Sequence, residues 1–443
     1  MKKSGSGPAV LAARLLSLAA AAAQLPFLTR ALPAEAYGTV AIVFALSSYF
    51  ALFGAEPATL AFQRHPGSNG ERGNYGYARA RLIASMAILA VIVCVAGLLA
   101  SDIEVALAVA AWGSGLAVAR FTATAWLMWN RPWAYASNLM TSTSLRTLTL
   151  IGLILLGEDG MLAVATAGLV STLASLLLAP RSSKTSRKLE TPPWPRQLGY
   201  QLALASLGVT VLASANLIVL QHFSSSEAAA PFAAMSQLAV LSSAALISLY
   251  LTVQYPSIRL SWDSGNESIV DRRLQRTSFM ILAVGSACIA AFIFGNGWLP
   301  SRIVNPDLVD LPILTLLVAA STMAGLSQVN GWRLQLRLRA GSLAIRSSAT
   351  ALALILLLFF FIPRVDAPSI GAAVVTLLGL ALHFCMTGGK ALMKQPVLIG
   401  MVIIFIVAVS STFFADLVYA TVACSVFATA SALVAVKKFR SSS

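Results

Sequence analysis

Four arginines and one glutamate lie inside long apolar stretches of this sequence. The arginines are Arg14, Arg120, Arg146 and Arg346, and the carboxylate is Glu56, in the run LFGAEPATL. Charged groups within apolar helices usually face a protein interior or an aqueous cavity, because their transfer into hydrocarbon is costly. The excess of arginine predicts a cationic cavity that attracts anions. Arginine suits phosphate in particular, since its planar guanidinium can donate two parallel hydrogen bonds.

Depth separates Arg146 from the other three arginines. At about 1.5 Å rise per residue, Arg146 lies roughly 20 Å from the cytoplasmic end of its predicted helix, near the membrane midplane. Its context is polar, NLMTSTSLRTLT, and we predict that it lines a cavity. Arg14, Arg120 and Arg346 lie about 7 to 12 Å deep. Each of these three either lines the same cavity or extends back to the anionic headgroups of the inner leaflet.

Glu56 is the only carboxylate well inside a predicted span, and Pro57 follows it directly. We predict that it pairs with Arg14 on the neighbouring helix, either as a structural ion pair or as a proton-coupled switch. The structural role is the simpler interpretation.

Motifs of enzymes and cofactor sites are missing from the sequence. There is no GxxxxGK[ST] phosphate loop, which a nucleotide-driven pump would need, and neither GxSxG nor HExxH occurs. The three histidines are far apart, and the four cysteines all fall inside apolar runs, where they are expected to serve in packing. We therefore expect no catalytic residues, no metal and no cofactor.

The elements that position these charges are predicted to be membrane-spanning helices. Of the 443 residues, 58% are hydrophobic and 11% are charged, against roughly half and a quarter in an ordinary soluble domain. This composition excludes a soluble enzyme and predicts an all-α, polytopic membrane protein. The net charge of +15 is expected at cytoplasmic headgroups, so membrane lipids are predicted partners and nucleic acid is not.

Apolar runs bounded by charge, proline and glycine predict about fourteen transmembrane helices. The predicted spans are 8–28, 36–60, 79–100, 104–128, 133–156 and 161–180, then 197–221, 228–254, 278–299, 308–331, 341–362 and 368–388, and finally 396–415 and 417–436. This pattern divides the chain into a six-helix lobe (1–180), a basic cytoplasmic linker (181–196), a second six-helix lobe (197–388) and a helix pair with a basic tail (389–443). The first span is interrupted by Arg14, which favours an uncleaved helix over a signal peptide.

The distribution of basic residues predicts the orientation. One face of the fourteen-helix arrangement has only Arg30, Arg302 and Arg364, whereas nearly all other lysines and arginines in the loops lie on the opposite face. Because basic loops stay in the cytoplasm, both termini are predicted to be cytoplasmic. Two six-helix halves that both start in the cytoplasm are parallel repeats, which enclose a central cavity between them.

Reporter fusions test this orientation. Reporters that are active only outside the cytoplasm should be silent at Ser186 and Ser443 and active near Asp159. An active outside reporter at Ser186 would contradict the orientation and every depth derived from it.

The opening block resembles the polysaccharide flippases, for O-antigen or exopolysaccharide, of the multidrug/oligosaccharidyl-lipid/polysaccharide exporter superfamily. The resemblance rests on Arg14 and on LTRALPAEAYGTVAIVFALSSYFALFGAEPATLAFQRH, from Leu28 to His65, with its LPxExYG turn and the FG that precedes a basic inner loop. It implies alternating access, with an undecaprenyl-diphosphate-linked oligosaccharide passed from the cytoplasmic to the outer leaflet. It also implies a bacterial cytoplasmic (inner) membrane location, and a polysaccharide polymerase and glycosyltransferases as further partners.

The sequence departs from one branch of this superfamily. Arg14 corresponds to the helix 1 arginine of the lipid II flippases, but the second helix has Glu56 and no arginine, and the eighth has neither lysine nor arginine. This departure argues against lipid II as the substrate.

Three other functions stay open. A multidrug or small-molecule cation antiporter of the same superfamily should favour buried carboxylates, which the excess of arginine opposes. A membrane glycosyltransferase or polymerase normally needs larger outer loops than this chain offers. A scaffold that transports nothing is the third alternative.

Overall fold

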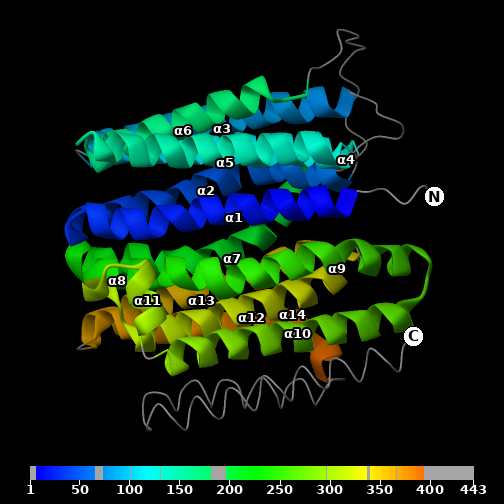
Figure 1. The fold of residues 1–443 in the computed structure, drawn as a ribbon. Coiled ribbons are helices and arrows are strands. Elements are labelled where there is room, and N and C mark those ends of the chain that lie inside the picture. The colour runs from blue at the N-terminus through cyan, green and yellow to red at the C-terminus, as the bar shows by residue number, and fades with distance from the viewer. Residues whose placement is uncertain are drawn as a thin grey trace. The chain divides into compact units, whose positions relative to one another are not determined.

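The computed structural model of the protein is helical throughout the residues that it describes (Figure 1). These residues are 6–64, 73–100, 102–129, 131–180, 196–295, 297–336, 340–365 and 367–393, and they include no strand. The predicted helices 396–415 and 417–436 and most of the predicted linker lie outside the described residues. The all-α prediction is confirmed, and the count of fourteen spans stays a prediction.

Six helices make up the first part of the chain. They are α1 (Ser6–Ala31), α2 (Ala34–Arg64), α3 (Gly73–Leu99), α4 (Ile103–Met128), α5 (Pro132–Leu155) and α6 (Gly160–Leu177). Each overlaps one predicted span, because an apolar run of this length can satisfy its backbone hydrogen bonds only as a helix within a bilayer. The turn before α6 contains Gly157 at φ 84°, and the side chain of Asp159 caps α6 by accepting a hydrogen bond from the Met161 amide.

The second part contains six further long helical segments. They are α7 (Arg196–Phe223), a segment formed by α8 (Ser226–Ala239), η2 (Val240–Ala244) and α9 (Ala245–Asp263), then α10 (Glu267–Phe294), α12 (Leu311–Leu336), α13 (Ala340–Phe361) and α14 (Pro368–Met393). Short helices α11 (Trp298–Ile303), η3 (Pro306–Leu308) and η4 (Ile362–Arg364) lie in the connections.

Two of these segments differ from their predicted spans. The helix predicted at 278–299 begins earlier, at Glu267, because Asn266 caps it by accepting a hydrogen bond from the Ile269 amide and polar residues then extend it beyond the apolar run. It ends earlier, at Phe294, before Gly297 at φ 75°. The helix predicted at 228–254 contains the π-helical turn η2, which an uninterrupted apolar run does not indicate.

The chain divides into two compact units, Met1–Thr210 and Val211–Ser443. The division falls inside α7, so the first half of this helix belongs with α1 to α6. Residues 181–195 of the predicted linker are not described, and its cytoplasmic location stays a prediction.

Ten helical segments among the described residues are long and apolar enough to cross a membrane. They include α1 to α4, α6 and the α8–η2–α9 segment. The helix α5 is not among them, since its sequence includes Asn138, Arg146 and a run of serines and threonines. The number of apolar helices makes the protein a multi-pass membrane protein.

The same helix pairs pack together in both units. In the first unit α4 packs on α2, α3 and α6, and in the second α12 packs on the α8 segment, α10 and α14. Small residues permit the closest approaches, as is common where helices associate in a membrane. An ideal Cβ on Gly168 of α6 would lie 2.5 Å from the backbone of Ala111 and Trp112 of α4, and one on Gly285 of α10 would overlap Thr322 Oγ1 of α12.

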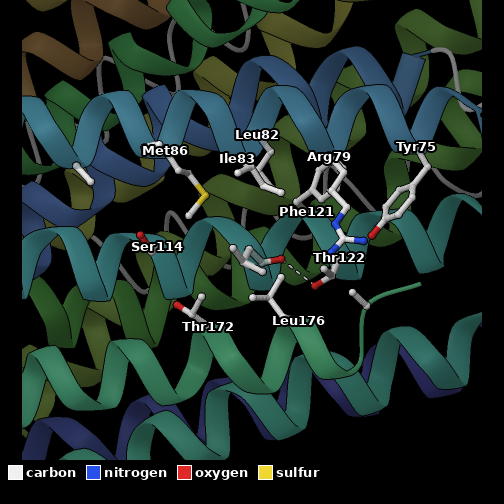
Figure 2. Close-up of a pocket in the computed structure, with 14 residues that line it drawn as sticks. Tyr75, Arg79, Leu82, Ile83, Met86, Ser114, Phe121, Thr122, Thr172 and Leu176 are labelled. Carbon is white, nitrogen blue, oxygen red and sulfur yellow. Dashed lines mark hydrogen bonds between the residues drawn. The ribbon is translucent and has the colours of Figure 1, made fainter. Parts of the chain in front are cut away.

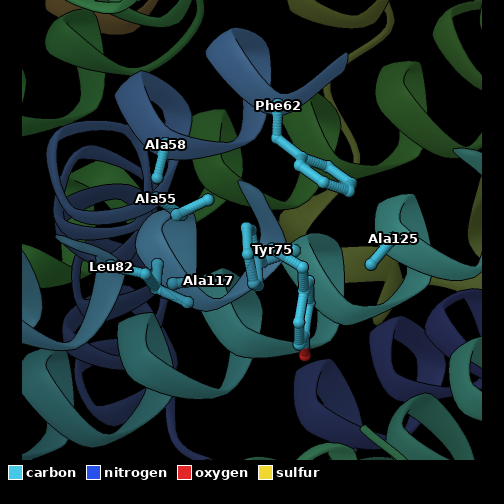
Figure 3. Packing of buried hydrophobic residues seen from close by; sticks show 9 residues of the cluster. Ala55, Ala58, Phe62, Tyr75, Leu82, Ala117 and Ala125 are labelled. Atoms are coloured by element: carbon cyan, nitrogen blue, oxygen red, sulfur yellow. The ribbon is translucent and has the colours of Figure 1, made fainter. Parts of the chain in front are cut away.

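A cluster of alanines and aromatic side chains joins α2, α3 and α4 at one end of the first unit (Figure 3). The rings of Tyr75 and Phe121 stack at 5.5 Å, and Phe62 meets Tyr75 edge to face at 6.1 Å. All three side chains are buried. This packing fixes the position of Tyr75 on α3.

Candidate functional site

The structure places three of the four arginines that we predict to lie within the membrane in the first unit and one in the second. Arg14 lies on α1, Arg120 on α4 and Arg146 on α5, whereas Arg346 lies on α13. Each has a different partner within its own unit.

Arg146 lies over the ring of Trp112. Its guanidinium carbon is 4.7 Å from the ring centroid, and Trp112 in turn stacks on Phe44 of α2 at 4.6 Å. The Arg146 Nε is buried and has no hydrogen-bond partner among the described residues. The sequence predicts that Arg146 lines a cavity and does not indicate Trp112 as its partner, because no spacing rule links a residue of α4 to one of α5.

At the depth that we predict for Arg146, near the bilayer centre, the cation–π contact does not by itself compensate its charge. Such contacts contribute about 0.5 to 2 kcal/mol, whereas a charge at the bilayer centre costs at least about 2.5 to 3.5 kcal/mol on insertion scales. No carboxylate pairs with Arg146 among the described residues. The guanidinium therefore retains hydrogen-bonding capacity for an anion or for water.

A series of polar contacts joins α1 to α5 around Arg146. Ser17 and Thr143 hydroxyls are 3.1 Å apart, and Gln24 Nε2 donates to Thr147 Oγ1 at 2.6 Å. These threonines flank Arg146 in sequence, so part of its polar context serves to bond two helices together. The orientation of α5 about its axis directs Thr143 and Thr147 toward α1. The same orientation determines the direction in which the Arg146 side chain leaves the helix.

Arg14 also bonds α1 to α5, because its Nε donates to the Tyr135 hydroxyl at 3.0 Å. Its side chain is half-buried. The predicted pairing of Arg14 with Glu56 is therefore wrong. The helices α1 and α2 follow each other in sequence but make few contacts, and α1 packs mainly on α5.

Glu56 pairs instead with Arg120 of α4. Its side chain is 1% exposed, whereas that of Arg120 is 62% exposed. The pairing follows from the extensive packing of α2 on α4. A buried carboxylate without a partner would be strongly destabilising, so the ion pair supports the structural role that we predicted for Glu56.

A double-mutant cycle tests this role. Glu56→Gln should lower the amount of folded protein in the membrane, because it leaves the pair incomplete, and Arg120→Gln in the same chain should restore part of the loss. Folded protein is measured by size-exclusion chromatography of detergent extracts. Normal folded levels of Glu56→Gln together with lost transport would contradict the structural role and favour a coupling role.

Arg346 stabilises the packing of α13 on α14. Its Nη1 donates to the Met386 carbonyl at 2.8 Å, and one turn away the Thr350 hydroxyl lies 3.3 Å from His383 Nδ1. His383 is buried, and its contact with Thr350 joins α14 to α13. These bonds account for Arg346 without a ligand, so among the four arginines Arg146 keeps the most unused hydrogen-bonding capacity.

No group of three histidine, cysteine or acidic side chains suited to a metal ion occurs in the part of the chain that the structure describes. The site is built instead from one arginine, the Trp112–Phe44 stack and the α1–α5 polar contacts.

The paired helices of the two units form a polytopic all-α fold that is also found in solved structures. A multidrug resistance MATE family transporter of the MOP superfamily, in an inward-facing conformation, aligns over 88% of this chain and 98% of its own with a TM-score of 0.60 at 14% identity. The lipid II flippase MurJ, in an inward closed conformation, aligns over 98% of both chains with a TM-score of 0.60 at 12% identity. A MATE protein in complex with MaD3S aligns over 89% of this chain with a TM-score of 0.58 at 14% identity.

These structures share the fold of this chain. One of them is named as a transporter and one as a flippase. The sequence matches no protein-family model and no curated protein.

Proposed function

We propose that the protein is a flippase that moves an undecaprenyl-diphosphate-linked oligosaccharide from the cytoplasmic to the outer leaflet of a bacterial inner membrane, for surface polysaccharide synthesis. The observation that carries the proposal is Arg146, a half-buried arginine with an aromatic partner and no carboxylate among the described residues. A diphosphate is an anion that its guanidinium can bind through two parallel hydrogen bonds.

The charge of the other intramembrane groups supports an anionic substrate. Glu56 is neutralised by Arg120, so it does not offset the positive charge of Arg146. The polymerase and the glycosyltransferases that act on the same carrier lipid are the proposed partners. The fold shared with MurJ is compatible with a lipid-linked substrate.

A cation antiporter is the second candidate. The fold is shared equally with MATE transporters, and Glu56 is a buried carboxylate of the kind that binds a proton or a cation. In this alternative the Glu56–Arg120 pair would open during transport, and Glu56→Gln would remove transport without removing folded protein.

Two complementation assays separate the candidates. In a host that lacks its own flippase, the full-length protein should restore surface polysaccharide, whereas in a host that lacks multidrug exporters it should not increase resistance to cationic dyes. Dye resistance without polysaccharide export, at equal membrane levels of the protein, would reject the flippase and favour the antiporter.

A further inference from the structure

A second potential binding site lies in the first unit, between α3, α4 and α6. The pocket has a volume of about 410 Å³, and most of its wall is apolar (Figure 2). Its apolar side chains include Leu82, Ile83 and Met86 of α3, Val118 and Phe121 of α4, and Leu176 of α6. Arg14, Arg120, Arg146 and Arg346 do not line it.

One end of the pocket is polar. Figure 2 shows Arg79 and Tyr75 of α3 extending toward Thr122 of α4. Arg79 is the only charged residue among the described residues that line the pocket, and its side chain is half-buried. A ligand at this end is therefore expected to be anionic.

The Tyr75 hydroxyl is an independent indication of a ligand. The side chain is 0% exposed, and its hydroxyl has no hydrogen-bond partner among the described residues. Stacking on Phe121 and the contact with Trp129, at 5.1 Å between ring centroids, hold the ring in place. Because a buried polar group without a partner is costly, the hydroxyl is expected to bond to a group that the described chain does not supply.

Along α3 the pocket borders an apolar surface. Ile83, which lines the pocket, is 53% exposed, and farther along α3 Ile88, Val91 and Ile92 are all more than half exposed. Such a surface on a membrane-spanning helix contacts lipid. A ligand that reaches the pocket from this side needs a hydrocarbon chain as well as an anionic head.

We propose that this pocket binds an anionic phospholipid of the inner leaflet. Arg79 and Tyr75 donate hydrogen bonds to its phosphate, and one acyl chain lies along Leu82, Met86 and Leu176. Arg79 is six residues into α3, which corresponds to about 9 Å along the helix. With the predicted orientation, this depth lets the guanidinium reach the cytoplasmic headgroups. The proposal does not depend on what the protein transports.

Native mass spectrometry of the full-length, detergent-purified protein tests the site. Phosphatidylglycerol and phosphatidylcholine with identical acyl chains are titrated in separate experiments. The affinity for the first phosphatidylglycerol molecule that binds should be higher than the affinity for any phosphatidylcholine molecule. Arg79→Gln should weaken phosphatidylglycerol binding about tenfold or more, because it removes a charge-assisted hydrogen bond. Arg81→Gln is the matched control, since Arg81 lies on the same helix and does not line the pocket.

Tyr75→Phe keeps the proposal testable if Arg79→Gln folds poorly. It retains the ring and removes only the hydroxyl, so the protein should fold normally and bind phosphatidylglycerol several-fold more weakly, the expected effect of one lost hydrogen bond. Equal binding of the two lipids, or equal weakening by Arg79→Gln and Arg81→Gln, would overturn the site. Displacement of phosphatidylglycerol by inorganic phosphate alone, or stronger binding of undecaprenyl phosphate, would overturn the assignment to a resident phospholipid.

Discussion

Replacement of Arg146 by alanine is expected to abolish export of surface polysaccharide while the protein remains folded in the membrane. The variant loses the groups that we propose bind the substrate diphosphate. Two charge-assisted hydrogen bonds of about 1.5 to 3 kcal/mol each correspond to a loss of about a hundredfold or more. Folding should be little affected, because the structure gives the side chain a cation–π contact and no ion pair among the described residues.

Arg146→Lys and a neighbouring substitution sharpen this test. Lysine keeps the charge and loses the planar fork, so Arg146→Lys should retain part of the export. Leu145→Ala, on the adjacent and exposed position of α5, is the control and should export normally. Surface polysaccharide is measured in a flippase-deficient host together with the membrane level of each variant. Export by Arg146→Ala at the parental level would remove the main support for an anionic substrate.

Trp112 allows the same site to be tested from α4. Trp112→Leu removes the ring on which the Arg146 guanidinium lies, yet it leaves the guanidinium itself. The expected loss of export is therefore smaller than for Arg146→Ala.

The helices could be predicted from the sequence more completely than their contacts. A run of about 20 apolar residues is expected to form a helix in a bilayer, so twelve of the predicted spans overlap helical segments of the structure. The extension of α10 to Glu267 was missed because it is polar, and η2 was missed because a π-helical turn does not change the apolar pattern.

Partners between helices could not be predicted in the same way. Adjacency in sequence predicts Arg14 as the partner of Glu56, whereas the bundle places α2 against α4 and thus Glu56 against Arg120. Trp112 was missed as the partner of Arg146 for a related reason: which residue of α4 faces α5 depends on the rotation of both helices. A sequence signal did exist in the glycines of α4 and α6, since small residues mark close helix approaches.

Substitution of Gly168 is expected to produce the largest loss of folded protein. A Cβ at this position would lie 2.5 Å from the backbone carbon of Ala111 and the backbone nitrogen of Trp112. Backbone atoms cannot move aside as a flexible side chain can, so even Gly168→Ala must push α4 and α6 apart. Overpacking of this kind costs about 1 to 3 kcal/mol, and Gly168→Val should exceed that range because its two further methyl groups point into the same contact.

Gly152 of α5 provides the control, because a Cβ there would have no neighbour within 4 Å. Gly152→Ala should leave stability unchanged or raise it by up to about 1 kcal/mol, the difference in helix propensity between the two residues. The measurement is the melting temperature and the monodisperse fraction of each variant in detergent. The backbone nitrogen of Trp112 is one of the atoms that a Cβ on Gly168 would meet. The fraction of Gly168→Ala protein that folds should therefore also export less, because the displaced indole of Trp112 no longer supports Arg146. Equal stability of Gly168→Ala and Gly152→Ala would show that α4 and α6 do not approach as closely as the structure has them.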